Sequence, residues 1–387
     1  MHPSAVSHLP WDPKLAHLRG MAALIVLVFH VFHTFFGHWQ PQARFSGIGW
    51  IVEGHTGVTL FFVLSGYLFM SIAMRMNGDI NYRSFLRNRV LRIFPLYIVF
   101  FVVAISIGRD AFRPMDFLYV IFSNIGLAPT SNQFITGAAW TIGVELGFYI
   151  VFPFLARFAL EQGPSYLPRL VLLLLLLKWG AYSMSDRPTH MIYSTLLGRL
   201  DQFLIGMWAA QLVKGVFSAQ LRSGLHGGFL FAAAFGVWAA LEAQSLWASY
   251  FLANPIQGAW VLWPTFEALM WSLLLVTYAS WQGSFGVLIE KVLARAGEIS
   301  FSIYLWHALV IHALVRALGD QWPHLLSKAS WHVWAVVFTV TVIAVTWVIA
   351  SLSYKTIELP FTQLRRRYGA PSTATVAEQA PHGTKSP

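Results

Sequence analysis

The sequence has no cysteine, which excludes disulfide bonds and thiol chemistry. Charge is also scarce: charged residues make up 11% of the chain, against roughly 25% in a soluble domain. A water-soluble surface cannot be built from so few charges. Because hydrophobic residues make up 57%, the composition predicts an all-α, polytopic membrane protein.

Three further features are missing. Residues 1–17 are mostly polar and no small-residue cleavage pattern follows the first apolar run, so we expect the first helix to remain as an anchor. No segment is long enough for a separate soluble domain, and no internal repeat marks a transporter built of two halves.

The last residues of the chain are mostly small or polar and include prolines, as in a disordered segment. We therefore expect a cytoplasmic N-terminal segment 1–17, a membrane domain 18–367 and a disordered cytoplasmic tail 368–387.

Ten apolar runs approach the ~20 residues that a spanning helix needs. They are 18–36, 56–73, 93–108, 140–156, 168–184, 192–213, 227–246, 260–280, 299–318 and 333–353. We interpret the shorter run 117–128 as re-entrant or interfacial; if it also crosses, the C-terminus changes side. With a cytoplasmic N-terminus, lysine and arginine inside outnumber those outside about threefold, as the positive-inside rule predicts. We predict about ten spanning helices with both termini cytoplasmic, and the net charge of +10 then gives no reason to expect nucleic acid.

The first run, 18–36, carries Arg19 at its head and His30 and His33 inside. The eleven residues from Arg19 to His30 come within ~20° of three helical turns, which places both side chains on one face, ~16 Å apart. An ionisable side chain at such depth is costly, so it indicates function. The alternative to a functional role is a structural one, in which the histidine only forms a hydrogen bond to a neighbouring helix.

An arginine cluster lies before the span that we expect to begin at Ile93, with Pro95 in the first turn. Its members are Arg87, Arg89 and Arg92. Arg89 and Arg92 are three residues apart and share a helical face. They could anchor the helix on lipid phosphates, or bind a phosphorylated ligand from the cytosol, which we favour.

Other ionisable side chains fall inside apolar runs. Glu145 and His307 could meet His30 near mid-membrane, although the sequence does not show that their helices touch. Lys178 is long enough to extend its ammonium to the membrane surface. Further charges are Arg199, Asp201 and Glu267, and the spacing of the histidines gives no reason to expect a metal.

These residues occur, in order, in motifs that resemble those of the acyltransferase-3 family over about residues 13–367. The family consists of integral-membrane acyltransferases that modify surface polysaccharides and other glycans. LRGMAALIVLVFH resembles its first helix, with Arg19 and His30, and RNRVLRIFPLY contains a pair similar to its acyl-CoA-associated arginines. The segments WTIGVELGFY, GRLDQFLIG, SFSIYLWH and YKTIELPF resemble further motifs, which contain Trp140, Glu145, Arg199, Tyr304, His307 and Glu358.

The resemblance implies transfer of an acyl group, usually acetyl, from cytosolic acyl-CoA to a hydroxyl of a glycan or glycolipid at a bacterial inner membrane. His30 is then a general base or a transient acyl carrier, and Arg19 holds the thioester carbonyl oxygen or a phosphate. The implied site is completed by Glu145 and His307 as catalytic residues, by Arg87, Arg89 and Arg92 for acyl-CoA, and by Trp140, Arg199, Tyr304 and Glu358 as further candidates.

The implied partners are acyl-CoA, a glycan or lipid-linked sugar acceptor, membrane lipids and polysaccharide-assembly proteins, with no metal. Some family members carry an extracytoplasmic hydrolase-like domain after the membrane part. We expect none in this protein, which would then act alone or with a separate partner. Two other classes stay open. One is a transporter or flippase of an acylated or sugar-linked lipid, and the other is a non-catalytic membrane partner in an assembly complex.

Overall fold

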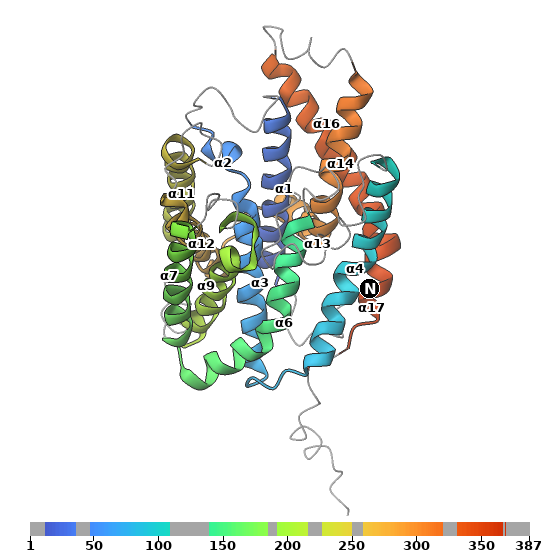
Figure 1. Cartoon of the computed structure of the whole chain (residues 1–387). Helices are drawn as coiled ribbons and strands as arrows, with labels where there is room; N and C mark the ends of the chain where they lie inside the picture. Colours follow the sequence, from blue (N-terminus) through green and yellow to red (C-terminus); the bar gives the residue numbers. More distant parts are fainter. Residues whose placement is uncertain are drawn as a thin grey trace, which may run out of the picture.

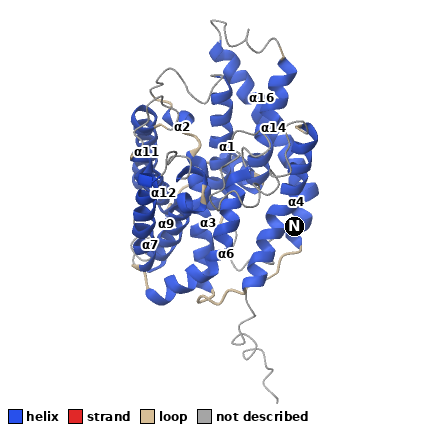
Figure 2. Ribbon diagram, in the orientation of Figure 1, coloured by secondary structure: helices blue, strands red, loops and turns tan. Residues whose placement is uncertain are grey.

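The computed structural model describes residues 12–35, 47–108, 139–184, 192–215, 227–249, 258–319, 331–366 and 368. Every regular element in these ranges is a helix (Figures 1 and 2). The long helices are α1 (Pro13–Phe35), α3 (Thr56–Arg75), α4 (Tyr82–Ile107), α6 (Ala139–Gln162), α7 (Tyr166–Met184), α9 (Leu196–Gly215), α11 (Gly227–Ala243), α12 (Ala259–Ser280), α14 (Ser300–Leu318) and α16 (Trp331–Ser353). Shorter helices are α2 (Gly49–Val52), α13 (Val287–Glu298) and α17 (Leu359–Gln363), with π-helical turns at Gln244–Ala248 and Tyr354–Glu358.

Each of the ten predicted runs falls on one long helix, which confirms an all-α, multi-pass membrane bundle. Within the described ranges, nine helices are long and apolar enough to cross a membrane. Helix α9, which carries Arg199 and Asp201, is not among the nine. The run 117–128 and nearly all of the tail 368–387 lie outside the described residues.

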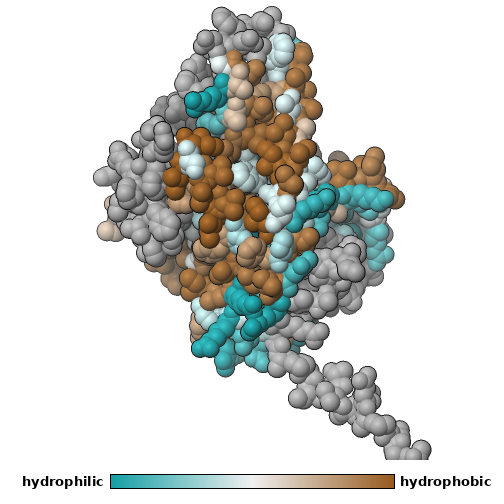
Figure 3. All heavy atoms as spheres, turned by 90° about the vertical axis from the view of Figure 1, so that its right-hand side faces the viewer, coloured by the Kyte–Doolittle hydropathy of each residue, from teal (hydrophilic) through white to brown (hydrophobic). Residues whose placement is uncertain are grey.

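The outer surface of the bundle is apolar. Large hydrophobic side chains are exposed along α4, α7, α11 and α16, for example Val102, Leu176, Phe231 and Val340. On the face shown in Figure 3, hydrophobic residues cover much of the middle, and hydrophilic residues form an oblique band from the lower left to the right-hand edge. Exposure of this kind fits lipid rather than water, because lipid imposes no penalty on apolar side chains.

Helices α1, α3 and α9 form the centre of the bundle. A Cβ atom on Gly66 of α3 would lie 2.1 Å from the carbonyl oxygen of Phe203, and one on Gly206 of α9 would lie 2.1 Å from that of Val63. The backbones of α3 and α9 therefore touch, as small residues allow in membrane helices. This contact holds α9 and its charges inside the protein.

Helix α4 begins earlier than the sequence suggested. We expected a span from Ile93 with Pro95 in its first turn, but the helix begins at Tyr82, so Pro95 lies in its interior. The reason is an N-cap: the side chain of Asn81 accepts a hydrogen bond from the backbone N–H of Ser84 at 2.9 Å. The arginine cluster is consequently part of the helix, with side chains in fixed directions.

One end of the bundle gathers the elements that build the site. Helix α1 begins, α3 ends and α4 begins at this end, which we call the proximal end. Helix α13 packs on the start of α1, since a Cβ atom on Gly297 would lie 2.0 Å from the carbonyl oxygen of Ala16. Helix α14 follows α13 directly, so it also begins there. The distal end is where α1 ends and α3 begins.

Candidate active site

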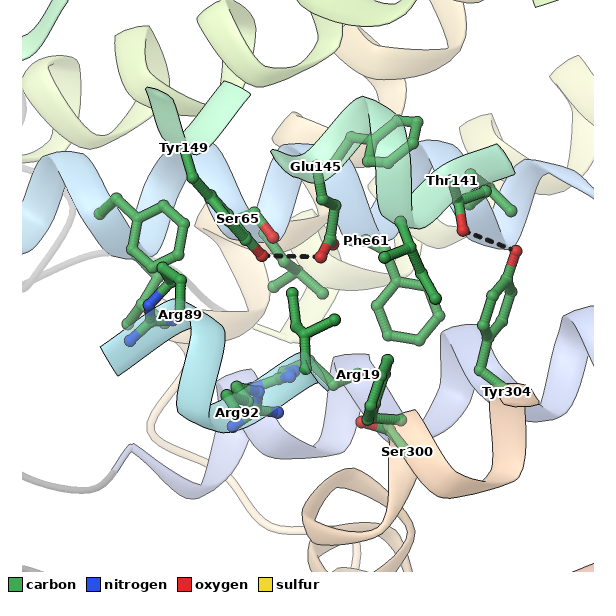
Figure 4. A pocket seen from close by; sticks show the side chains of 18 of the residues that line it. Arg19, Phe61, Ser65, Arg89, Arg92, Thr141, Glu145, Tyr149, Ser300 and Tyr304 are labelled. Carbon is green, nitrogen blue, oxygen red and sulfur yellow. Dashed lines mark hydrogen bonds between the residues drawn. The ribbon is translucent and has the colours of Figure 1, made fainter. Parts of the chain in front are cut away.

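A pocket opens between α1, α3, α4, α6 and α14. Its polar lining consists of Arg19, Ser65, Arg89, Arg92, Thr141, Glu145, Tyr149, Ser300 and Tyr304 (Figure 4). Phenylalanine, leucine, isoleucine and valine side chains make up the rest. The pocket therefore combines an apolar wall with a few polar groups, which is typical of a small-molecule site.

Three arginines converge on the proximal part of this pocket. Arg19 comes from α1, and Arg89 and Arg92 come from one face of α4, as their spacing predicted. The guanidinium of Arg89 lies 4.8 Å from the centre of the Phe69 ring. Arg87 does not line the pocket, because two residues along a helix turn its side chain away from Arg89.

Glu145 faces the arginines from the opposite wall. Its carboxylate accepts a hydrogen bond of 2.6 Å from the hydroxyl of Tyr149, one turn later on α6 (Figure 4). Both residues line the pocket together with Arg19. Of the meeting of Glu145, His30 and His307 that the sequence allowed, the structure brings only the two histidines into hydrogen-bonding contact.

Tyr304 connects the pocket to the histidines. Its hydroxyl accepts a hydrogen bond of 3.0 Å from Thr141, which joins α14 to α6 at the pocket wall. The centre of its ring lies 5.9 Å from that of His307, one turn further along α14. A ligand that fills the pocket to Tyr304 thus ends beside His307.

His30 and His307 form a pair between α1 and α14. Nδ1 of His30 lies 3.2 Å from Nε2 of His307, and the ring centres are 4.8 Å apart. Each Nδ1 also lies close to a carbonyl of its own helix: Val26 at 2.8 Å for His30, and Ile303 at 3.1 Å for His307. Both Nδ1 atoms carry the hydrogen, because a carbonyl oxygen only accepts.

This network assigns the two lone pairs. With hydrogen on its Nδ1, neutral His307 presents the lone pair of Nε2 to the Nδ1–H of His30. In the His30 ring, the lone pair is then on Nε2. The carbonyl of Val26 thus holds His30 in the tautomer with its lone pair on Nε2, as a general base or a nucleophile requires, and His307 accepts a second hydrogen bond from the same Nδ1–H.

The distal side of His30 is lined by two more histidines around Phe29. The centres of the His30, His33 and His55 rings lie 5.0, 4.4 and 5.6 Å from that of Phe29. His33 donates to the carbonyl of Val52 at 3.1 Å, so it ties α1 to the segment before α3.

His55 is paired with Glu53 at 2.9 Å, and both side chains are buried. The sequence reasoning missed these two residues. In the sequence, the one sign of a functional role for them is that two ionisable residues directly precede an apolar run. Only the tertiary fold brings them to His30.

Arg199 lies in an aromatic setting inside the bundle. It is 1% exposed, and its guanidinium lies 4.5 Å from the centre of the Tyr193 ring and 5.6 Å from that of Trp140. Glu358 is also buried, but it accepts a hydrogen bond from Ser302 and does not line the pocket. It therefore ties the chain after α16 to α14.

The prediction that Lys178 extends to the membrane surface is wrong. Its ammonium lies 2.8 Å from a carboxylate oxygen of Asp201, and both side chains are buried. Thr265 donates a hydrogen bond to the same carboxylate. The buried carboxylate of Asp201 offsets part of the cost of burying the ammonium.

The geometry defines a membrane protein with an arginine-lined pocket beside a histidine pair. A family model described as an acyltransferase domain matches residues 12–351, so the chain belongs to the acyltransferase-3 family and is a multi-pass membrane acyltransferase. It is 24% identical to the peptidoglycan O-acetyltransferase OatA of Listeria monocytogenes over 90% of this chain, but spans only 55% of that relative. It is also 24% identical to the acyltransferase MdmB of Streptomyces mycarofaciens, over 97% of this chain and 98% of the relative. No solved structure matches significantly.

Proposed function

We propose that the protein transfers an acetyl group from acetyl-CoA, bound at the proximal end and supplied from the cytosol of a bacterium, to a hydroxyl of a glycan or lipid-linked sugar. The observation that carries this proposal is the continuity of the site. The pocket reaches from three arginines to Tyr304, and Tyr304 lies against His307, which contacts His30.

The arginines suit the phosphates of the donor, since guanidinium groups bind phosphate by paired, charge-assisted hydrogen bonds. Arg19 and His30 share α1 and are ~16 Å apart along it. That distance is too long for Arg19 to touch a carbonyl attacked beside His30, so we assign Arg19 to a phosphate. The pantetheine arm would then extend along the apolar wall toward Tyr304.

In the proposed reaction, Nε2 of His30 takes the proton of the acceptor hydroxyl, and the hydroxyl oxygen attacks the thioester carbonyl. The tetrahedral intermediate collapses as the carbon–sulfur bond breaks. The CoA thiolate leaves and receives the proton from His30, which gives an acetyl ester and CoA thiol. Such a base contributes about 10²- to 10⁴-fold to the rate.

A sugar hydroxyl fits as the acceptor on two grounds. The Listeria relative is named for O-acetylation of peptidoglycan, a glycan-containing polymer. In addition, Trp140, Tyr193 and Trp260 form a line of rings, with centres 5.2 and 6.2 Å apart, and His55 lies 5.5 Å from Tyr193. Aromatic faces next to polar groups suit a carbohydrate that reaches His30 from the distal side.

The test uses inverted membrane vesicles that contain the protein, supplied with acetyl-CoA labelled in the acetyl group. Free CoA thiol and the destination of the label are followed for wild type, His30→Ala and, as a control, His312→Ala. His312 is an exposed histidine on α14, five residues after His307. We expect wild type and His312→Ala to label a glycan or glycolipid, and His30→Ala to lose at least 10²-fold in turnover while still binding acetyl-CoA.

Retained turnover in His30→Ala would remove His30 from the mechanism. Label on the protein itself, formed without acceptor and absent from His30→Ala, would make His30 a transient acyl carrier instead of a base. No protein-dependent thiol release in acceptor-rich native membranes would contradict the proposal and favour a transporter or a scaffold.

A further inference from the structure

The chain after α17 returns across the first turns of α4. Asn88 binds the backbone of Arg366 twice: its Nδ2 donates to the carbonyl oxygen at 2.6 Å, and its Oδ1 accepts from the N–H at 2.9 Å. The backbone N–H of Asn81 donates to the carbonyl oxygen of Tyr368 at 2.8 Å. Residues 364–366 and 368, which we call the return segment, are therefore fixed to the helix that carries the pocket arginines.

Tyr368 makes direct contact with one of these arginines. Its side chain is 5% exposed, its ring centre lies 5.9 Å from that of Phe85, and its hydroxyl accepts a hydrogen bond from Nη2 of Arg89. The hydroxyl thus helps to fix the direction of the Arg89 guanidinium. A residue far from the arginine cluster in sequence takes part in building the pocket.

Arg365 lies in the same segment, and its positive charge is not balanced by a contact. Its Nε and Nη2 atoms are buried without a hydrogen-bond partner among the described residues. Burial, and then the positive charges of Arg92 and Arg89, lower the pKa of Arg365 to about 9. Three guanidinium groups are therefore held close enough to repel one another.

The carboxylates around this cluster offset only part of its positive charge. Glu358 is held by Ser302, and Glu145 by Tyr149. With Arg19, four arginines face two carboxylates in the part of the chain that the structure describes. A buried cation is costly unless an anion lies beside it, so this end of the pocket is suited to a ligand with several negative charges.

We propose that the Arg365 side chain binds the ribose 3′-phosphate of the acyl-CoA donor at the outer wall of the nucleotide site, where Tyr368 positions Arg89. This inference rests on the proposed function, in which acyl-CoA is the donor. Arg19, Arg89 and Arg92 line the pocket, whereas Arg365 lies outside the lining. We therefore assign it to a part of the donor far from the thioester, the phosphorylated ribose.

The test compares Arg365→Gln with Arg366→Gln in the full chain, reconstituted in proteoliposomes. Both substitutions remove one positive charge from neighbouring positions, but the side chain of Arg366 is exposed. The donors are acetyl-CoA and acetyl-dephospho-CoA, which lacks only the 3′-phosphate. For Arg365→Gln we expect the KM of acetyl-CoA to rise about 10- to 100-fold with kcat unchanged, because a hydrogen bond to a charged group is lost.

Acetyl-dephospho-CoA should show the same KM for wild type and Arg365→Gln, and Arg366→Gln should match wild type with both donors. An unchanged KM of acetyl-CoA in Arg365→Gln, or an equal rise in Arg366→Gln, would overturn the inference and leave the proposed function intact. If wild type released thiol from neither donor, the proposed function itself would fail.

Tyr368→Phe provides a test that does not depend on the folding of Arg365→Gln. It keeps the ring against Phe85 and removes only the hydroxyl that Arg89 contacts. We expect the KM of acetyl-CoA to rise about 2- to 10-fold with kcat unchanged, as for the loss of one hydrogen bond. A KM equal to that of wild type would show that Tyr368 does not position Arg89.

Discussion

The pairing of His30 with His307 leads to a prediction about a residue that acts through the proposed base. His307→Ala removes the acceptor for the Nδ1–H of His30 but leaves His30 in place. His30 then retains the bond to the carbonyl of Val26, so it remains a base. We expect a lower kcat with an unchanged KM for acetyl-CoA, because His307 does not line the arginine pocket.

The magnitude follows from the charge that develops in the reaction. When His30 takes a proton, its Nδ1–H becomes part of an imidazolium, and the hydrogen bond to Nε2 of His307 becomes a bond to a charged group. Such bonds contribute about 1.5–3 kcal/mol, which corresponds to a fall in kcat of about 10- to 150-fold. His30→Ala should cost more, since it removes the base itself.

The assay measures kcat and KM for thiol release by His307→Ala, His307→Gln and His312→Ala. The side-chain oxygen of glutamine can accept the hydrogen bond, so His307→Gln should recover part of the lost kcat. Thermal unfolding in detergent checks the fold, because His307 is fully buried. A wild-type kcat in His307→Ala, or equal losses in His307→Ala and His307→Gln with both proteins folded, would refute the reasoning.

Two further predictions concern stability. Gly66→Val should lower the free energy of unfolding by at least about 1–3 kcal/mol, because its Cβ atom would lie 2.1 Å from the carbonyl oxygen of Phe203. Gly180→Val, where a Cβ atom meets nothing within 4 Å, is its control, and equal unfolding temperatures would contradict the close contact of α3 and α9. Asp201→Asn should destabilise the protein by about 3–5 kcal/mol, since it leaves the Lys178 ammonium buried without its carboxylate. The double variant Lys178→Met, Asp201→Leu should recover most of that loss, and a double variant as unstable as Asp201→Asn would argue against the ion pair.

Local patterns predicted which side chains share a helical face. The spacing of Arg89 and Arg92 predicted a common face, on which both line the pocket, because three residues along a helix return to the same face whatever surrounds it. The start of α4 was predicted too late, because the expectation followed the apolar run and overlooked the N-cap at Asn81. The polar first turns of α4 show that a membrane helix can begin well before its apolar part.

Buried charges were harder to predict than helix positions. Lys178 was expected to reach the surface, yet Asp201 on another helix satisfies it inside the bundle. Glu145 was grouped with the histidines, yet it bonds Tyr149 on the arginine side of the pocket. In each case the sequence showed an ionisable group within an apolar run, but the partner depends on which helices are neighbours.

The sequence by itself determined the class of structure, the positions of the helices and the face that Arg19 shares with His30. These properties depend on composition and on the helical repeat, which act within one segment. Only the tertiary structure decided that His30 meets His307, 277 residues later, and that the return segment reaches Arg89. Contacts between distant helices depend on side-chain packing across the whole bundle, as at Gly66 and Gly206, and no local pattern specifies them.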